Sequence, residues 1–100
     1  MATVRHVVMF KYKEGVSKEE VTAGIDKGIA SLPAQIPEIV SSKFGPDLAL
    51  DPERNHDYIA LVDFKSKEDY LVYASHPAHI AVIKEFIIPN LAPGGRVAVQ

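Results

Sequence analysis

The sequence predicts a ferredoxin-like α+β sandwich with the element order β-α-β-β-α-α-β and an antiparallel sheet. Stretches rich in β-branched and aromatic residues alternate with stretches of helical periodicity, so the order forms two βαβ-like halves. Proline and glycine fall at the boundaries between these stretches. The length of 100 residues fits a single domain over residues 1–100, with a modest core.

The first half contains a strand, a helix and a second strand. Residues 3–13 form the first strand, which carries apolar side chains on both faces. Ser17 and Glu20 form a capping box that starts the helix. The apolar stripe of this helix consists of Val21, Ile25, Ile29 and Leu32. Pro33 and Pro37 end the helix, and a weakly patterned strand follows over residues 36–44.

The second half begins with a loop over residues 46–56, long enough to suggest a binding loop or lid. The clearest strand of the chain follows it. The remaining elements are this strand over residues 57–65, helices over 70–75 and 78–88, and a short strand over 96–99. We expect Pro89 and the Pro93-Gly94-Gly95 segment to close the last helix.

The two late helices meet at a corner formed by His76 and Pro77. Pro77 fixes its own φ and disfavours the α region for His76, so one helix ends there and the next begins. We expect His76 to cap the second helix. A corner of this kind can aim the Tyr73 phenol and the His79 imidazole at one spot, although six residues separate them. The corner is therefore a candidate site.

One face of a ferredoxin-like sheet has no helices to cover it. We expect this open face to hold His6, Val8, Phe10, Tyr58, Ala60, Val62 and Phe64. Such a face is too apolar to remain in water, and hydrophobic residues make up 47% of the chain. Two copies placed sheet to sheet would hide it and enclose a cavity. The sequence thus predicts a homodimer that binds a hydrophobic small molecule, aromatic or polyketide-like.

Composition excludes several classes of function. The net charge is −2 and no basic run occurs, which argues against a nucleic-acid partner. The absence of cysteine excludes disulfides, thiolate catalysis and Cys-ligated zinc. No apolar stretch reaches the ~20 residues that a membrane span needs, and residues 1–5 do not resemble a signal peptide. We therefore expect a cytoplasmic protein with no membrane partner.

Three segments resemble the stress-responsive dimeric α/β-barrel domain family. They are Arg-His-Val-Val-Met-Phe-Lys at residues 5–11, Asp-Tyr-Ile-Ala-Leu-Val-Asp-Phe at residues 57–64, and Tyr-Ala-Ser-His-Pro-Ala-His at residues 73–79. The resemblance covers residues 3–99 and implies a homodimer whose two sheets form an α+β barrel. One characterised member of the family is a plant polyketide cyclase that makes olivetolic acid. It is a lyase that closes a linear poly-β-keto thioester by aldol condensation.

Similarity to that cyclase implies roles for individual residues. His79 would be the general base, Tyr73 would hold the substrate carbonyl, and His6 would line the cavity. The reaction would need no cofactor. We expect four further residues of the cavity face to contact the substrate: Val8, Phe10, Tyr58 and Val62. The cyclase has a histidine where this chain has Tyr58, so its own substrate is not carried over.

Other interpretations remain open. The chain could be a non-catalytic stress-responsive barrel, in which His79 and Tyr73 only order the corner, or a cofactor-independent oxygenase or isomerase. A metal site built from His76, His79 and His6 is disfavoured, because no carboxylate accompanies the corner and Pro77 interrupts the spacing. A magnesium or manganese site in the long loop, at Asp47 and Asp51, is weaker still, and His56 is expected to be solvated.

Overall fold

The computed structural model describes residues 3–100 and confirms the predicted ferredoxin-like fold. The strands and helices are β1 (Val4–Tyr12), α1 (Lys18–Ala30), β2 (Ile39–Pro46), β3 (Tyr58–Phe64), α2 (Lys67–Ser75), α3 (Pro77–Val82) and β4 (Leu91–Val99). Two short turns join α3 to β4, a π-helical turn η1 (Ile83–Ile87) and a 3-10 turn η2 (Ile88–Asn90). No helix in the described part of the chain is long and apolar enough to cross a membrane.

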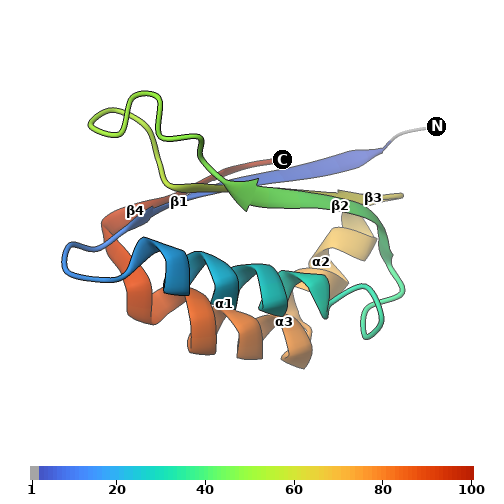
Figure 1. The fold of residues 1–100 in the computed structure, drawn as a ribbon. Coiled ribbons are helices and arrows are strands. Elements are labelled where there is room, and N and C mark those ends of the chain that lie inside the picture. Colours follow the sequence, from blue (N-terminus) through green and yellow to red (C-terminus); the bar gives the residue numbers. More distant parts are fainter. Residues whose placement is uncertain (1–2) are drawn as a thin grey trace.

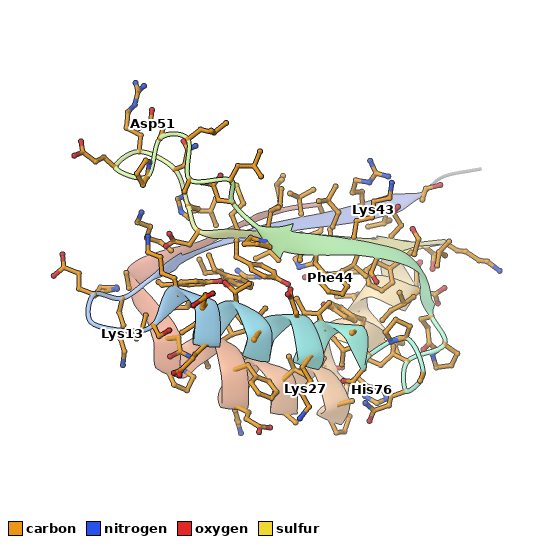
Figure 2. All side chains as sticks on the ribbon, in the orientation of Figure 1. Lys13, Lys27, Lys43, Phe44, Asp51 and His76 are labelled. Carbon is orange, nitrogen blue, oxygen red and sulfur yellow. The ribbon has the colours of Figure 1, made fainter. Side chains whose placement is uncertain are left out.

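The four strands form one antiparallel sheet in the order β2-β3-β1-β4. The helices lie on one face of this sheet, and the other face is open (Figure 1). Neighbouring residues of β2 show the pleat, since Lys43 lies on the open side and Phe44 on the helix side (Figure 2). The loop between β2 and β3 rises on the open side, with Asp51 near its tip (Figures 1 and 2).

The prediction of which sheet face is open is wrong. The seven residues expected on the open face are all buried beneath the helices: His6, Val8, Phe10, Tyr58, Ala60, Val62 and Phe64. The open face carries the alternate positions of the same strands, including Val7, Met9, Ile59 and Leu61, which are half-buried or exposed. Both faces are apolar, but the helices cover the face with the aromatic rings, because that face buries more apolar surface.

Packing of α1 onto the last helical segment depends on two glycines. A Cβ at Gly24 would lie 2.9 Å from the ring of Phe86, and one at Gly28 would lie 2.8 Å from Val82 Cγ1. The absence of a side chain at these two positions therefore allows close packing between helical segments. The predicted capping box at the start of α1 is confirmed in part: the Ser17 hydroxyl accepts a hydrogen bond from the Glu20 amide at 3.3 Å, but within the described chain the Ser17 amide makes no return bond to the Glu20 carboxylate.

The last strand begins five residues earlier than predicted, at Leu91 instead of Arg96. Tyr12 pairs with Leu91 and Phe10 pairs with Arg96, so β4 contains an irregular bulge between these pairs. Gly94 within the bulge has a φ of +66°, which favours glycine. The glycines that suggest a loop in the sequence therefore lie inside the strand, and they determine where Arg96 sits.

Candidate functional site

A cavity of about 200 Å³ lies between the helix side of the sheet and the helical segments that follow α2. Its walls are mostly aliphatic and come from β1, α1, β3, α2, α3, η1, η2 and β4. The polar side chains that line it are His6, Tyr70, Tyr73, His79 and Arg96. The cavity is thus inside one protomer, under the helices. The sequence predicts that these residues line a cavity between two facing sheets, and this location is wrong.

Most of the residues expected at the site line this cavity. These are His79, Tyr73, His6, Val8, Phe10 and Val62. Tyr58, which the sequence also places at the site, does not line this cavity. Its hydroxyl donates a hydrogen bond to Asp26 Oδ1 at 2.6 Å, and its ring is buried between sheet and α1. Burial and the Asp26 carboxylate raise the pKa of Tyr58, so this phenol stays protonated and structural.

The corner at residues 76–77 forms as predicted. His76 has an extended conformation, with φ −65° and ψ 134°, and Pro77 starts α3. The Nδ1 atom of His76 accepts a hydrogen bond from the Ala78 amide at 3.0 Å. The prediction that His76 caps the helix is confirmed. This capping role commits Nδ1 of His76 to the backbone and leaves His79 as the corner histidine in the cavity.

His79 presents a free lone pair. Its Nδ1 atom lies 3.2 Å from the Ala74 carbonyl oxygen. A carbonyl oxygen can only accept, so Nδ1 carries the proton of the neutral ring and Nε2 keeps its lone pair. Burial lowers the pKa of His79 below 6.5, partly offset by the hydrogen bond to Ala74, and the positive charge of Arg96 lowers it further. His79 is therefore neutral at pH 7 and able to accept a proton.

Tyr73 presents its phenol to the same cavity. The rings of Tyr73 and His79 have centroids 4.1 Å apart and are tilted by 32°. Burial raises the pKa of Tyr73 to about 12, so the phenol remains a donor. Among the described residues the Tyr73 hydroxyl has no hydrogen-bond partner. Every fully buried side-chain N or O atom of these residues has one, so the Tyr73 hydroxyl is not fully buried. The hydroxyl is therefore accessible from the cavity.

His6 is held by Gln100, a contact that the sequence does not reveal. The Gln100 Nε2 atom lies 2.7 Å from His6 Nδ1 and 3.2 Å from the Tyr70 hydroxyl. An amide nitrogen only donates, so His6 Nδ1 accepts and Nε2 carries the proton. Burial lowers the pKa of His6 to about 4, and Arg96 and His79 add to this effect. The two neutral imidazoles thus offer opposite functions, an N–H from His6 and a lone pair from His79.

The lowered pKa of His6 predicts a pH-dependent stability. Unfolded His6 binds a proton near pH 6.5, whereas folded His6 stays neutral down to about pH 4. The contribution of His6 to the free energy of unfolding should therefore be fully present above pH 6.5. It should be lost, by up to about 3 kcal/mol, as the pH drops toward 4. Urea unfolding between pH 4 and 8 should show this slope in the wild type and a flatter one in His6→Phe. Equal slopes in the two proteins would refute the buried neutral imidazole.

A metal centre finds no support in the geometry. Within residues 3–100 no group of three or more His, Asp or Glu side chains is placed to hold a metal ion. Asp51 lies at the tip of the loop on the open side of the sheet, far from His76 at the end of the helix layer (Figure 2). A larger hollow of about 440 Å³ lies between this loop and α1. The half-buried carboxylate that lines this hollow, Asp57, already pairs with Lys18 at 3.0 Å.

The chain matches a known family over nearly its whole length. The model of the stress responsive A/B barrel domain matches residues 4–99. The Arabidopsis thaliana protein HS1, named for this domain, is 32% identical over 85 residues, which cover 84% of this chain and 77% of HS1. A longer Arabidopsis thaliana protein, also named for this domain, is 27% identical over 86 residues. The match covers 86% of this chain but only 32% of the longer protein, so the chain spans about a third of that relative.

Solved structures with the same fold include proteins with and without a described activity. A dimeric ferredoxin-like protein of unknown function from Thermobifida fusca is 32% identical, with a TM-score of 0.83 and coverage of 97% of this chain and 87% of that one. A hydroxynitrile lyase from Passiflora edulis is 26% identical, with a TM-score of 0.78 and coverage of 97% and 89%. A cofactor-independent oxygenase from Streptomyces nogalater, 11% identical with a TM-score of 0.71 and coverage of 98% and 91%, shares the fold alone. On the family match and the fold, this chain belongs to the stress-responsive A/B barrel domain family.

Proposed function

We propose that this chain is a cofactor-independent lyase that closes a short poly-β-keto compound by aldol condensation in the cavity under its helices. The observation that carries the proposal is the pair formed by His79 and Tyr73. A neutral imidazole with a free Nε2 lone pair and a protonated phenol face the same apolar cavity, with ring centroids 4.1 Å apart. A base and a hydrogen-bond donor in that arrangement suit proton removal next to a carbonyl group.

The proposed reaction needs only groups of this chain. His79 Nε2 takes a proton from a carbon between two carbonyl groups, and the electron pair moves onto one carbonyl oxygen. Tyr73 donates a hydrogen bond to this enolate oxygen. The enolate carbon then attacks a second carbonyl carbon of the same molecule, which forms the C–C bond and leaves an alkoxide. The alkoxide takes the proton back from His79, so the imidazole returns to its neutral state. Elimination of water from the cyclic β-hydroxy ketone, which loses its hydroxyl group and an adjacent C–H proton, completes the condensation.

The cavity sets limits on the substrate. Its aliphatic and aromatic walls favour an apolar ligand with few polar groups. Its volume of about 200 Å³ is below the range of about 300–1,000 Å³ that is typical of drug-sized ligands. We therefore assign a short substrate with one ring or its open-chain equivalent. His6 Nε2–H can donate to a second oxygen of such a molecule.

Similarity to the Passiflora edulis hydroxynitrile lyase supports a lyase on this fold. The two curated Arabidopsis relatives are named for the domain and not for a reaction, which favours a second candidate function. In that alternative the cavity holds a small hydrophobic ligand without converting it. Only the lyase needs a free lone pair on His79, and this requirement separates the two functions experimentally.

We further assign a homodimer that forms through the open face of the sheet. This face carries the apolar residues Val7, Met9, Ile59, Leu61, Val97 and Val99, and Ile59, Val97 and Val99 are exposed in the single chain. The similar proteins of known structure include several dimeric ferredoxin-like proteins. Sedimentation equilibrium should show a dimer for the wild type and a monomer for the double variant Ile59→Lys, Val97→Lys. Leu71→Lys, at an exposed site on α2, is the matched control and should remain dimeric.

Proton removal can be measured without knowing the natural substrate. Acetophenone is a small aromatic ketone whose methyl hydrogens exchange slowly with D₂O at neutral pH. We expect the protein to accelerate this exchange saturably, and to convert a linear poly-β-keto thioester into a cyclised product detected by mass spectrometry. Binding of acetophenone, seen as shifted amide signals of cavity residues, with no exchange above the buffer rate would exclude the lyase and favour the ligand-binding function.

A further inference from the structure

We propose that Arg96 binds a carboxylate on the ligand, so that the cavity selects small aromatic or alicyclic monocarboxylates over neutral molecules of the same shape. This inference rests on the proposed function in one respect, because it takes the same cavity as the ligand site. It adds the chemical class of the ligand. The binding of a carboxylate there follows from where β4 places Arg96, from the charges around it and from the polarity of the cavity wall.

The strand register places Arg96 on the helix side of the sheet. Arg96 pairs directly with Phe10 of β1, and residues that face each other across an antiparallel pair lie on the same side. Phe10 is 3% exposed and packs under the helices. Arg96 itself is exposed and lines the cavity, so its aliphatic stem borders the cavity while its guanidinium can reach water. This placement is that of a cation at the mouth of an apolar pocket.

The charge of Arg96 is not neutralised by another side chain among residues 3–100. The ion pairs of this part of the chain involve other cations, namely Arg5, Lys11, Lys18 and Arg54. No Asp or Glu within the described residues lines the cavity. Burial determines the direction in which the pKa values of His6, His79 and Tyr73 move, and the positive charge of Arg96 adds a smaller downward contribution at each of these three cavity groups. An anion bound there would complete the charge balance.

The chemistry of this end favours a carboxylate. A guanidinium can bind both oxygens of a carboxylate through two parallel hydrogen bonds. His6 Nε2–H and the Tyr73 hydroxyl are additional neutral donors beside it. A phosphate dianion would be expected to need more than one cation, and Arg96 is the only Lys or Arg among the lining residues of the described chain. A planar monoanion attached to an apolar body fits both the single guanidinium and the aliphatic wall.

Benzoate and benzamide test this selection, because they have nearly the same shape and differ in charge. Their dissociation constants can be measured by NMR titration of the amide signals of cavity residues at pH 7. We expect the wild type to bind benzoate roughly 10-fold or more tightly than benzamide, as for a charge-assisted hydrogen bond. In Arg96→Gln the affinity for benzoate should fall much more than the affinity for benzamide, so that the preference drops to about one. Arg96→Lys should keep part of the preference.

Arg5→Gln is the matched control, because Arg5 lies on the open face and pairs with Asp63. It should keep the full preference for benzoate. Equal binding of the two probes by the wild type, or an undiminished preference in Arg96→Gln, would overturn the inference and leave the proposed lyase untouched. If the wild type prefers benzoate but does not accelerate acetophenone exchange, the lyase is rejected and this inference stands. Failure of the cavity to bind either probe would overturn both.

Discussion

His79→Gln should lower the rate of acetophenone deuteration by about 10²–10⁴-fold, the contribution of a positioned general base. The glutamine side chain can still donate to the Ala74 carbonyl oxygen but has no basic nitrogen for the substrate proton. The fold should therefore survive while the reaction fails. The rate is measured by NMR from the loss of the methyl proton signal, and thermal unfolding monitors the fold in parallel.

His56→Gln provides the matched control for this substitution. His56 lies in the loop before β3 and does not line the cavity, so its replacement should leave the exchange rate unchanged. The wild-type rate should also be constant above pH 7 and decline on acidification, because the pKa of His79 lies below 6.5 and only the neutral ring accepts a proton. A full rate in His79→Gln would show that His79 is not the base. If His79→Gln keeps the full exchange rate and only unfolds at a lower temperature, the role of the His76-Pro77 corner is structural.

Gly95→Ala should destabilise the fold by about 1–3 kcal/mol, the usual cost of forcing extra volume into a packed site. A Cβ at this position would lie 2.6 Å from the Lys11 carbonyl oxygen and 2.8 Å from the Ala92 carbonyl oxygen. Both are backbone atoms, so relief requires the β1–β4 pairing to shift. The free energy of unfolding in urea measures the effect, and benzoate binding should weaken as well, because the same bulge positions Arg96.

Gly45→Ala is the control for this second prediction. Gly45 lies in β2, where an added Cβ would meet nothing within 4 Å among the described residues and the backbone has no positive φ. The same chemical change should therefore cost little there. If Gly95→Ala and Gly45→Ala unfold at the same urea concentration, the bulge tolerates a side chain and the role we give to Gly95 in placing Arg96 is wrong.

Much of the fold can be predicted from the sequence because its signals are local. The capping serine, the period of the apolar residues and the His76-Pro77 break all depend on neighbours in the chain, and the structure bears them out. The choice of sheet face is different. Both faces of β1 are apolar, so periodicity alone cannot decide which one the helices cover. The free energy of burying each face decides which one the helices cover. That free energy depends on aromatic residues contributed by several strands together.

The candidate site shows the same division. Tyr73 and His79 are close in sequence, and the corner brings them together in a way that local rules can anticipate. Arg96 reaches the cavity through the register of β4 with β1, and Gln100, which follows β4, contacts His6. That register depends on a bulge of proline and glycine residues that resembles a loop in the sequence. Contacts that depend on a shifted register have no local signal.

An NMR titration of the four histidines, with and without acetophenone, is the sharpest test of whether His79 acts as a neutral base in an apolar cavity. We predict that His79 is neutral at pH 7, with its proton on Nδ1, and that it titrates below pH 6.5. Acetophenone should shift its Nε2 resonance and leave His56 unchanged. A His79 with its proton on Nε2, or one that no ligand perturbs, would contradict the account and make the corner a structural element.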